Sequence, residues 1–101
     1  MNKSLIVQKY GGTSVGTLER IERVADRIVK IRKTGTDIVV VVSAMAGETD
    51  KLLKMARSLS KNPARREIDL LLSSGERISA ALLTIALQTR GLPALSMTGR
   101  Q

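Results

Sequence analysis

A lysine, two adjacent glycines and two hydroxyl side chains stand together in "KYGGTSVG", residues 9–16, directly after an apolar run. Glycines lack a Cβ, so their backbone can approach a ligand closely and can adopt positive φ angles. Amides there, together with the N-terminus of a following helix, form a natural anion site, and Lys9 would add a point charge beside a phosphate. An ordinary strand-to-helix turn is the alternative, and this motif alone slightly favours it. Neither GxxxxGK[ST] nor GxGxxG occurs, so no standard nucleotide-binding motif is present.

Hydroxyl groups recur in a second segment, "VVSAMAGETDKL", residues 41–52. Ser43 ends an apolar run, Gly47 loosens the loop, and Thr49 or Asp50 is expected to cap the next helix. A helix start explains Thr49 and Asp50 well. It does not explain why Ser43 and Thr49 should both lie at the same edge of a sheet, so a binding role stays open for this pair.

A single carboxylate stands out in a third segment, "LLSSGERISAALL", residues 71–83. Glu76 follows Gly75, which we expect to be a joint between two helical pieces. Apolar runs flank it on both sides, and a buried or half-buried carboxylate needs a partner. Two interpretations are equally supported: a structural carboxylate that pairs with Arg77 or a helix N-terminus, and a receptor for the ammonium group of a ligand.

The composition excludes several kinds of chemistry. The 101 residues include no cysteine and no histidine, so disulfides, thiolate metal sites, Ser-His-Asp triads and His-ligated zinc are ruled out. The formal net charge is +8, from 17 basic and 9 acidic residues. Tyr10 is the one aromatic residue, so stacking platforms for nucleic acid are missing and anionic small molecules are the better match. The apolar run near the N-terminus is too short for a signal peptide, and we expect no membrane span and a soluble, cytoplasmic protein.

Hydrophobic spacing predicts the elements that position these segments. We expect three strands, at residues 4–10, 37–43 and about 93–97. The stretches between them have helical spacing, at residues 17–33, 49–60 and 64–90. Helical crossovers between strands, and four consecutive valines, indicate a parallel α/β sheet. Ligands bind beyond the carboxyl ends of such strands, so residues 10–14, 43–49 and 97–99 should meet there.

The three segments, in this order and spacing, resemble the N-terminal part of the aspartokinases, a branch of the amino-acid kinase family. "SMTGRQ", residues 96–101, is similar to the start of a fourth family segment, so the resemblance covers essentially the whole chain. The sequence departs from the family at "AMAGETD", where a loop with glycine and aspartate after the methionine is more usual. Family members are several times longer. We therefore expect residues 1–101 to be the N-terminal portion of an amino-acid kinase domain, without the nucleotide-binding half and the regulatory ACT domains.

The resemblance implies a fold and an activity. The fold is a three-layer αβα sandwich around a mainly parallel sheet. The activity is transfer of the ATP γ-phosphoryl group to the β-carboxylate of L-aspartate, the first step toward lysine, threonine and methionine. Magnesium is held mainly through the nucleotide, with no metal ligand assigned in this chain. The attacking carboxylate is already ionised at neutral pH, so no general base is required, which suits a chain without histidine.

Residue roles follow from the same resemblance. Lys9 is the expected catalytic residue. The expected contacts to the ATP phosphates are Lys9, Tyr10, Gly11, Gly12, Thr13 and Ser14, with Tyr10 and the glycines acting through their backbone. Ser43 and Thr49 are expected to line the aspartate pocket, and Glu76 to bind the substrate amino group.

Two other functions remain open. One is a kinase for another acid, such as glutamate or acetylglutamate, although "SSGERIS" and "VVSAMAGETD" match the aspartate branch better. The other is a non-catalytic anion-binding or regulatory fragment that pairs with a full-length kinase. We also expect a homo-oligomer, or association with the missing part of the enzyme, and the chain by itself should be inactive.

Overall fold

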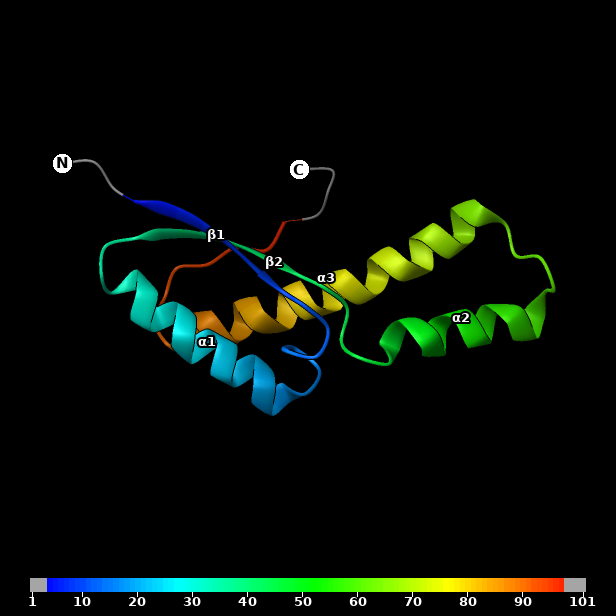
Figure 1. The fold of residues 1–101 in the computed structure, drawn as a ribbon, viewed down its shortest axis with the longest axis horizontal. Coiled ribbons are helices and arrows are strands. Elements are labelled where there is room, and N and C mark those ends of the chain that lie inside the picture. Colours follow the sequence, from blue (N-terminus) through cyan, green and yellow to red (C-terminus); the bar gives the residue numbers. More distant parts are fainter. Residues whose placement is uncertain (1–3, 98–101) are drawn as a thin grey trace.

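The structure, a computed structural model, describes residues 4–97 of the chain. Its elements in chain order are β1 (Leu5–Tyr10), α1 (Leu18–Arg32), β2 (Asp37–Val42), α2 (Glu48–Leu59) and α3 (Arg65–Thr89) (Figure 1). The bounds of all five lie within one residue of those predicted from hydrophobic spacing. The order of the first two strands and first three helices is therefore confirmed.

The two strands form a parallel sheet, as predicted. Leu5 lies opposite Asp37, and Tyr10 lies opposite Val42. Alternate residues of a strand point to opposite faces. Val40 and Val42 accordingly pack against the hydrophobic core, while Val39 and Val41 are exposed on the other face.

One layer of helices covers the core face of the sheet (Figure 1). Helix α1 is capped by Thr17, whose hydroxyl accepts a hydrogen bond from the amide of Arg20 at 3.1 Å. The buried stripe of α1 packs with residues from β1, the following loop and α3. The buried core consists of Tyr10, Val15, Ile21, Val24, Ala25, Ile28, Leu83 and Leu87. This packing fixes the direction in which both strands end, and therefore where their loops meet.

The opposite face of the sheet is open. Leu5 and Val7 are 64% and 67% exposed, and Val39 and Val41 are 47% and 46% exposed. Parallel sheets are normally covered on both faces. Of the three layers expected, residues 4–97 supply the sheet and one helical layer.

The predicted third strand is wrong for this chain. Residues 93–97 are an irregular segment and pair with neither β1 nor β2. A strand exists only where its backbone hydrogen-bonds to a neighbour, and Pro93 has no amide hydrogen to donate. A groove of about 870 Å³, lined by Val39–Val42 and by Leu92–Met97, separates the segment from β2. Residues 98 and 99 of the expected edge cluster, and "TGRQ" of the fourth segment, lie outside the described residues.

Two local predictions are also corrected. Helix α3 is continuous through residue 75, so Gly75 is a buried position inside a helix and forms no joint. The N-cap of α2 is Gly47, at φ 83°, and neither Thr49 nor Asp50 caps that helix. A left-handed backbone at position 47 favours glycine, and α2 begins at Glu48, two residues earlier than it would with Thr49 as its N-cap. Thr49 and Asp50 occupy its first turn instead.

Helix α3 runs without a break over 25 residues, where two helical pieces were expected. Within the described part of the chain it is the one helix that is long and apolar enough to cross a membrane by length and composition. A single such helix is weak evidence for a span, because core helices of soluble proteins have the same properties. Here α3 packs against α1, α2 and β2, and it carries Glu76 and Arg77 near its middle.

Candidate functional site

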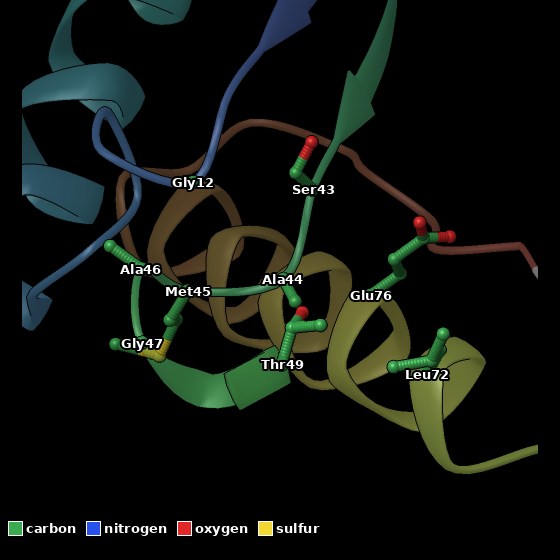
Figure 2. Close-up of a pocket in the computed structure, with 9 residues that line it drawn as sticks. All are labelled: Gly12, Ser43, Ala44, Met45, Ala46, Gly47, Thr49, Leu72 and Glu76. Atoms are coloured by element: carbon green, nitrogen blue, oxygen red, sulfur yellow. The ribbon is translucent and has the colours of Figure 1, made fainter. Parts of the chain in front are cut away.

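A hollow of about 400 Å³ opens at the carboxyl edge of the sheet, where three elements meet. Its walls come from the loop after β1, the loop from β2 into α2, and the middle of α3 (Figure 2). The lining residues are Gly12, Ser43, Ala44, Met45, Ala46, Gly47, Thr49, Leu72 and Glu76. Residues from all three polar segments identified in the sequence therefore share one hollow.

Two backbone hydrogen bonds hold the first two segments together. The amide of Ser43 donates to the carbonyl of Tyr10 at 3.1 Å, and the amide of Ala46 donates to the carbonyl of Gly12 at 3.1 Å. A Cβ at Gly12 would lie 2.8 Å from the carbonyl oxygen of Ala44, so a side chain is excluded there by close backbone approach. The positive φ angle considered for Gly11 and Gly12 is not adopted by either residue.

The glycine-rich loop keeps amides available for a ligand. The carbonyl of Gly11 accepts from the amide of Ser14 at 3.1 Å, and the carbonyl of Thr13 accepts from Nη1 of Arg20 at 2.9 Å. No residue among 4–97 accepts a hydrogen bond from the amides of Gly11, Gly12 or Thr13. Gly11, Thr13 and Ser14 are exposed. Unpaired exposed amides in a loop before a helix can bind an anion.

Tyr10 contributes to the site only through its backbone. Its ring is buried in the core, and its hydroxyl donates a 2.8 Å hydrogen bond to Oε1 of Gln8. The buried ring fixes the end of β1 against the helical layer. The carbonyl that Ser43 contacts is positioned by this anchor.

Lys9 does not line the hollow. It is exposed on β1 opposite Val41, on the open face of the sheet. Because alternate residues of a strand share a face, the residue after Val41 on this face is Ser43, just beyond the end of β2. The charge of Lys9 therefore stands at the open side of the same edge.

Glu76 differs from the half-buried carboxylate that its sequence context suggested. It is exposed, and it forms no ion pair with any residue among 4–97, so the pairing with Arg77, one of the two interpretations, is absent there. Ser43 and Thr49 are half-buried. Figure 2 shows these three side chains arriving from the end of β2, from α2 and from α3 around one hollow. A carboxylate and two hydroxyls in this arrangement can bind an ammonium group and a polar acid.

Of the remaining lining residues, Ala44, Met45, Ala46 and Gly47 fall within the predicted range 43–49, whereas Leu72, one helical turn before Glu76, was not predicted. The close packing of Ala44 had a partial signal in the sequence, since a glycine inside an apolar helix indicates close packing by a neighbour. Within residues 4–97, no three acidic side chains gather as a possible metal site.

The sequence that forms this fold and this hollow matches a known family. The amino acid kinase family matches residues 4–101, and the chain belongs to that family.

Among its relatives, the chain is 57% identical over 98 residues to the aspartate kinase Ask_LysC of Stutzerimonas stutzeri (strain A1501). It is 55% identical over 98 residues to an aspartokinase of Pseudomonas aeruginosa. Each comparison covers 97% of this chain and 24% of the relative, so the chain spans about a quarter of the length of the curated relatives it matches. The crystal structure of an aspartate kinase from Synechocystis superposes with a TM-score of 0.94 at 57% identity, covering 97% of this chain and 17% of that one.

Proposed function

We propose that residues 1–101 are the N-terminal portion of the kinase domain of an aspartate kinase, which transfers the ATP γ-phosphoryl group to the β-carboxylate of L-aspartate. The observation that carries this proposal is the 52–57% identity, over nearly the whole chain, to proteins named aspartokinase or aspartate kinase. The shared hollow at the carboxyl edge of the sheet supports it, because both reactants could meet there.

The glycine-rich loop is proposed to hold the ATP phosphates. The available amides of Gly11, Gly12 and Thr13 would donate to phosphate oxygens, with Ser14 and the backbone of Tyr10 completing the loop. Lys9 would neutralise charge on the transferred group. Charge-assisted bonds of this kind are stronger than neutral ones, and they act most where charge shifts during the reaction.

The hollow is proposed to hold aspartate. Glu76 would bind the substrate ammonium group, because its carboxylate is exposed and makes no ion pair within residues 4–97. Ser43 and Thr49 would donate hydrogen bonds to the substrate from the facing walls. Two hydroxyls and one carboxylate suit a zwitterionic amino acid better than a simple dicarboxylate.

The chemistry needs little from the protein beyond placement. An oxygen of the β-carboxylate forms the new bond to the γ-phosphorus, the bond from that phosphorus to the bridging oxygen breaks, and ADP leaves with the electron pair. Since the nucleophile is already ionised, no residue has to remove a proton. The rate enhancement therefore comes from positioning the two reactants and from neutralising the charge on the transferred phosphoryl group. Magnesium is proposed to be held mainly through the phosphates of the nucleotide.

We also propose a cytoplasmic location, and association of this segment with the rest of the kinase or with other subunits. The open sheet face supports such association, because a parallel sheet in this fold class is covered on both sides.

The function is tested by coupled ADP release with the full-length kinase that carries this segment. Turnover should depend on L-aspartate and should be weak with glutamate or N-acetylglutamate. Turnover with glutamate or N-acetylglutamate in preference to aspartate would identify a different amino-acid kinase. Phosphate binding with no turnover on any of the three acids would instead favour the non-catalytic, anion-binding role.

A further inference from the structure

Gly75 occupies an unusual place for a glycine. It is buried in the middle of the continuous 25-residue helix α3, where alanine would be the better helix former. A Cβ built on Gly75 would lie 2.8 Å from the Cβ of Ala44, a separation that real Cβ atoms essentially never show. The next nearest atoms, Cα of Ala44 and Cγ of Glu48, lie at 3.8 and 3.9 Å, which is ordinary contact. One methyl group of Ala44 therefore excludes a side chain at position 75.

Ala44 is confined on its other side as well. A Cβ at Gly12 would lie 2.8 Å from the carbonyl oxygen of Ala44, and the amide of Ala46 is bonded to the carbonyl of Gly12. The loop after β2 thus passes through a slot between two glycines, one before α1 and one inside α3. Neither the Cβ nor the carbonyl oxygen of Ala44 can move by a side-chain rotation. A larger residue at Gly75 or at Gly12 must therefore shift the backbone of the loop after β2.

The two confined residues are direct sequence neighbours of the proposed aspartate contacts. Ala44 follows Ser43, and Gly75 precedes Glu76. We propose that Gly75 and Ala44 are positioning residues, whose contact sets the separation between the wall that carries Ser43 and Thr49 and the wall that carries Glu76. This inference rests on the proposed function for the identity of the ligand, but the spacing itself is a property of the fold.

The test introduces a steric clash at Gly75 and then removes it at Ala44, and it measures the KM for aspartate in the full-length kinase that carries this segment. Gly75→Ala should raise the KM for aspartate roughly tenfold or more, with the KM for ATP changed less than about threefold, because small misplacements of binding groups are costly. Adding Ala44→Gly removes the methyl group that the new side chain meets. The double variant G75A/A44G should therefore recover an aspartate KM within about threefold of wild type.

Gly12→Ala provides the matched control. Its clash is with the backbone oxygen of Ala44, which Ala44→Gly leaves in place. Ala44→Gly should therefore rescue Gly75→Ala and fail to rescue Gly12→Ala. Thermal unfolding of every variant separates a shifted site from a damaged fold.

Crystal structures of wild type, G75A and G75A/A44G give a readout that needs no substrate. The distance from residue 44 to helix α3 should increase in G75A and return in the double variant. An unmoved loop, an unchanged aspartate KM in G75A, or equal rescue of G75A and G12A would each overturn the proposal. If G75A does not fold, recovery of folding and KM in the double variant supports the contact, and failure of both variants to fold overturns it. Absence of aspartate-dependent ADP release in the wild type would instead refute the proposed function, and the crystal structures would still decide the spacing.

Discussion

The backbone amide of Ser43 donates a 3.1 Å hydrogen bond to the carbonyl of Tyr10, one residue beyond the last register pair of the sheet, Tyr10 with Val42. The parallel pairing therefore continues past the ends of both strands. Since the ring of Tyr10 is buried in the core, this hydrogen bond restrains the position of the loop that contains Ser43. The proposed phosphate loop and the proposed aspartate wall are joined directly by this contact.

Lys9→Ala in the full-length kinase should lower kcat by about 10²- to 10³-fold, the range found when one charge-stabilising group is removed from an active site. The KM for aspartate should change much less, because phosphoryl charge shifts most in the transition state. Steady-state kinetics with both substrates varied give the two values. Lys33→Ala, which removes an exposed lysine just after α1, is the control and should be near wild type. Similar, small effects in both lysine variants would argue against a catalytic Lys9.

Glu76→Gln should raise the KM for aspartate by about 10- to 100-fold, because a hydrogen bond to a charged group contributes roughly 1.5–3 kcal/mol. The effect on kcat should be smaller. Glutamine keeps the size of the side chain and removes its charge, so the shape of the hollow is preserved. Glu67→Gln, an exposed acid in the first turn of α3, serves as the matched control. An aspartate KM equal in the two variants would remove Glu76 from the substrate site.

Arg90 should stabilise the fold far more than the exposed ion pair on α1 does. Its guanidinium, on a side chain 24% exposed, donates to Oδ1 of Asp26 at 2.8 Å and to the carbonyl of Ala86 at 2.9 Å, and so ties the end of α3 to α1. Arg90→Ala should lower the free energy of unfolding by about 1–3 kcal/mol.

The comparison is Arg23→Ala, which removes the exposed Arg23–Glu19 pair and should cost about 0.5 kcal/mol or less. Urea unfolding followed by circular dichroism measures both. Equal losses would mean that the Arg90 contacts add nothing beyond a surface pair.

The 101-residue chain should self-associate through its open sheet face. Leu5, Val7, Val39 and Val41 expose a contiguous apolar surface, and such surfaces drive association. Sedimentation velocity should show oligomers that grow with concentration. The variant V7T/V39T keeps the β-branched shape of both residues but makes them polar, and should shift the distribution toward monomer. A wild-type chain that stays monomeric at high concentration would show that this face needs no cover.

Residues 1–101 alone should not turn over ATP and aspartate. Correct placement of two reactants contributes about 7–11 kcal/mol in well-oriented systems, and the described residues supply only the glycine-rich loop and one hollow. A coupled ADP-release assay of the purified chain beside the full-length kinase measures the difference. Aspartate-dependent turnover by the chain itself would show that the complete active site lies within it.

The local elements of this protein were readable from its sequence because they depend on hydrophobic periodicity. The apolar spacing of Ile21, Val24 and Ile28 predicts α1, since this pattern shows which side of a segment avoids water. The valine run predicts a parallel strand, although Val39 and Val41 are exposed in residues 4–97. The meeting of residues 10–14 and 43–49 at one edge follows from the parallel sheet, whose strands end on the same side, whereas the position of Glu76 was implied by the family resemblance.

Tertiary structure decided the features that depend on a neighbour. Residues 93–97 are apolar enough for a strand, yet neither β1 nor β2 pairs with them, and Pro93 has no amide hydrogen to donate. Gly75 has the sequence signature of a helix break, but it lies inside α3 because the methyl group of Ala44 packs against its bare backbone. Glu76 is flanked by apolar residues, yet it is exposed because its side of α3 faces the hollow and the groove. In each case the outcome depends on whether residues far apart in the sequence lie close together in the fold, and no local pattern specifies that.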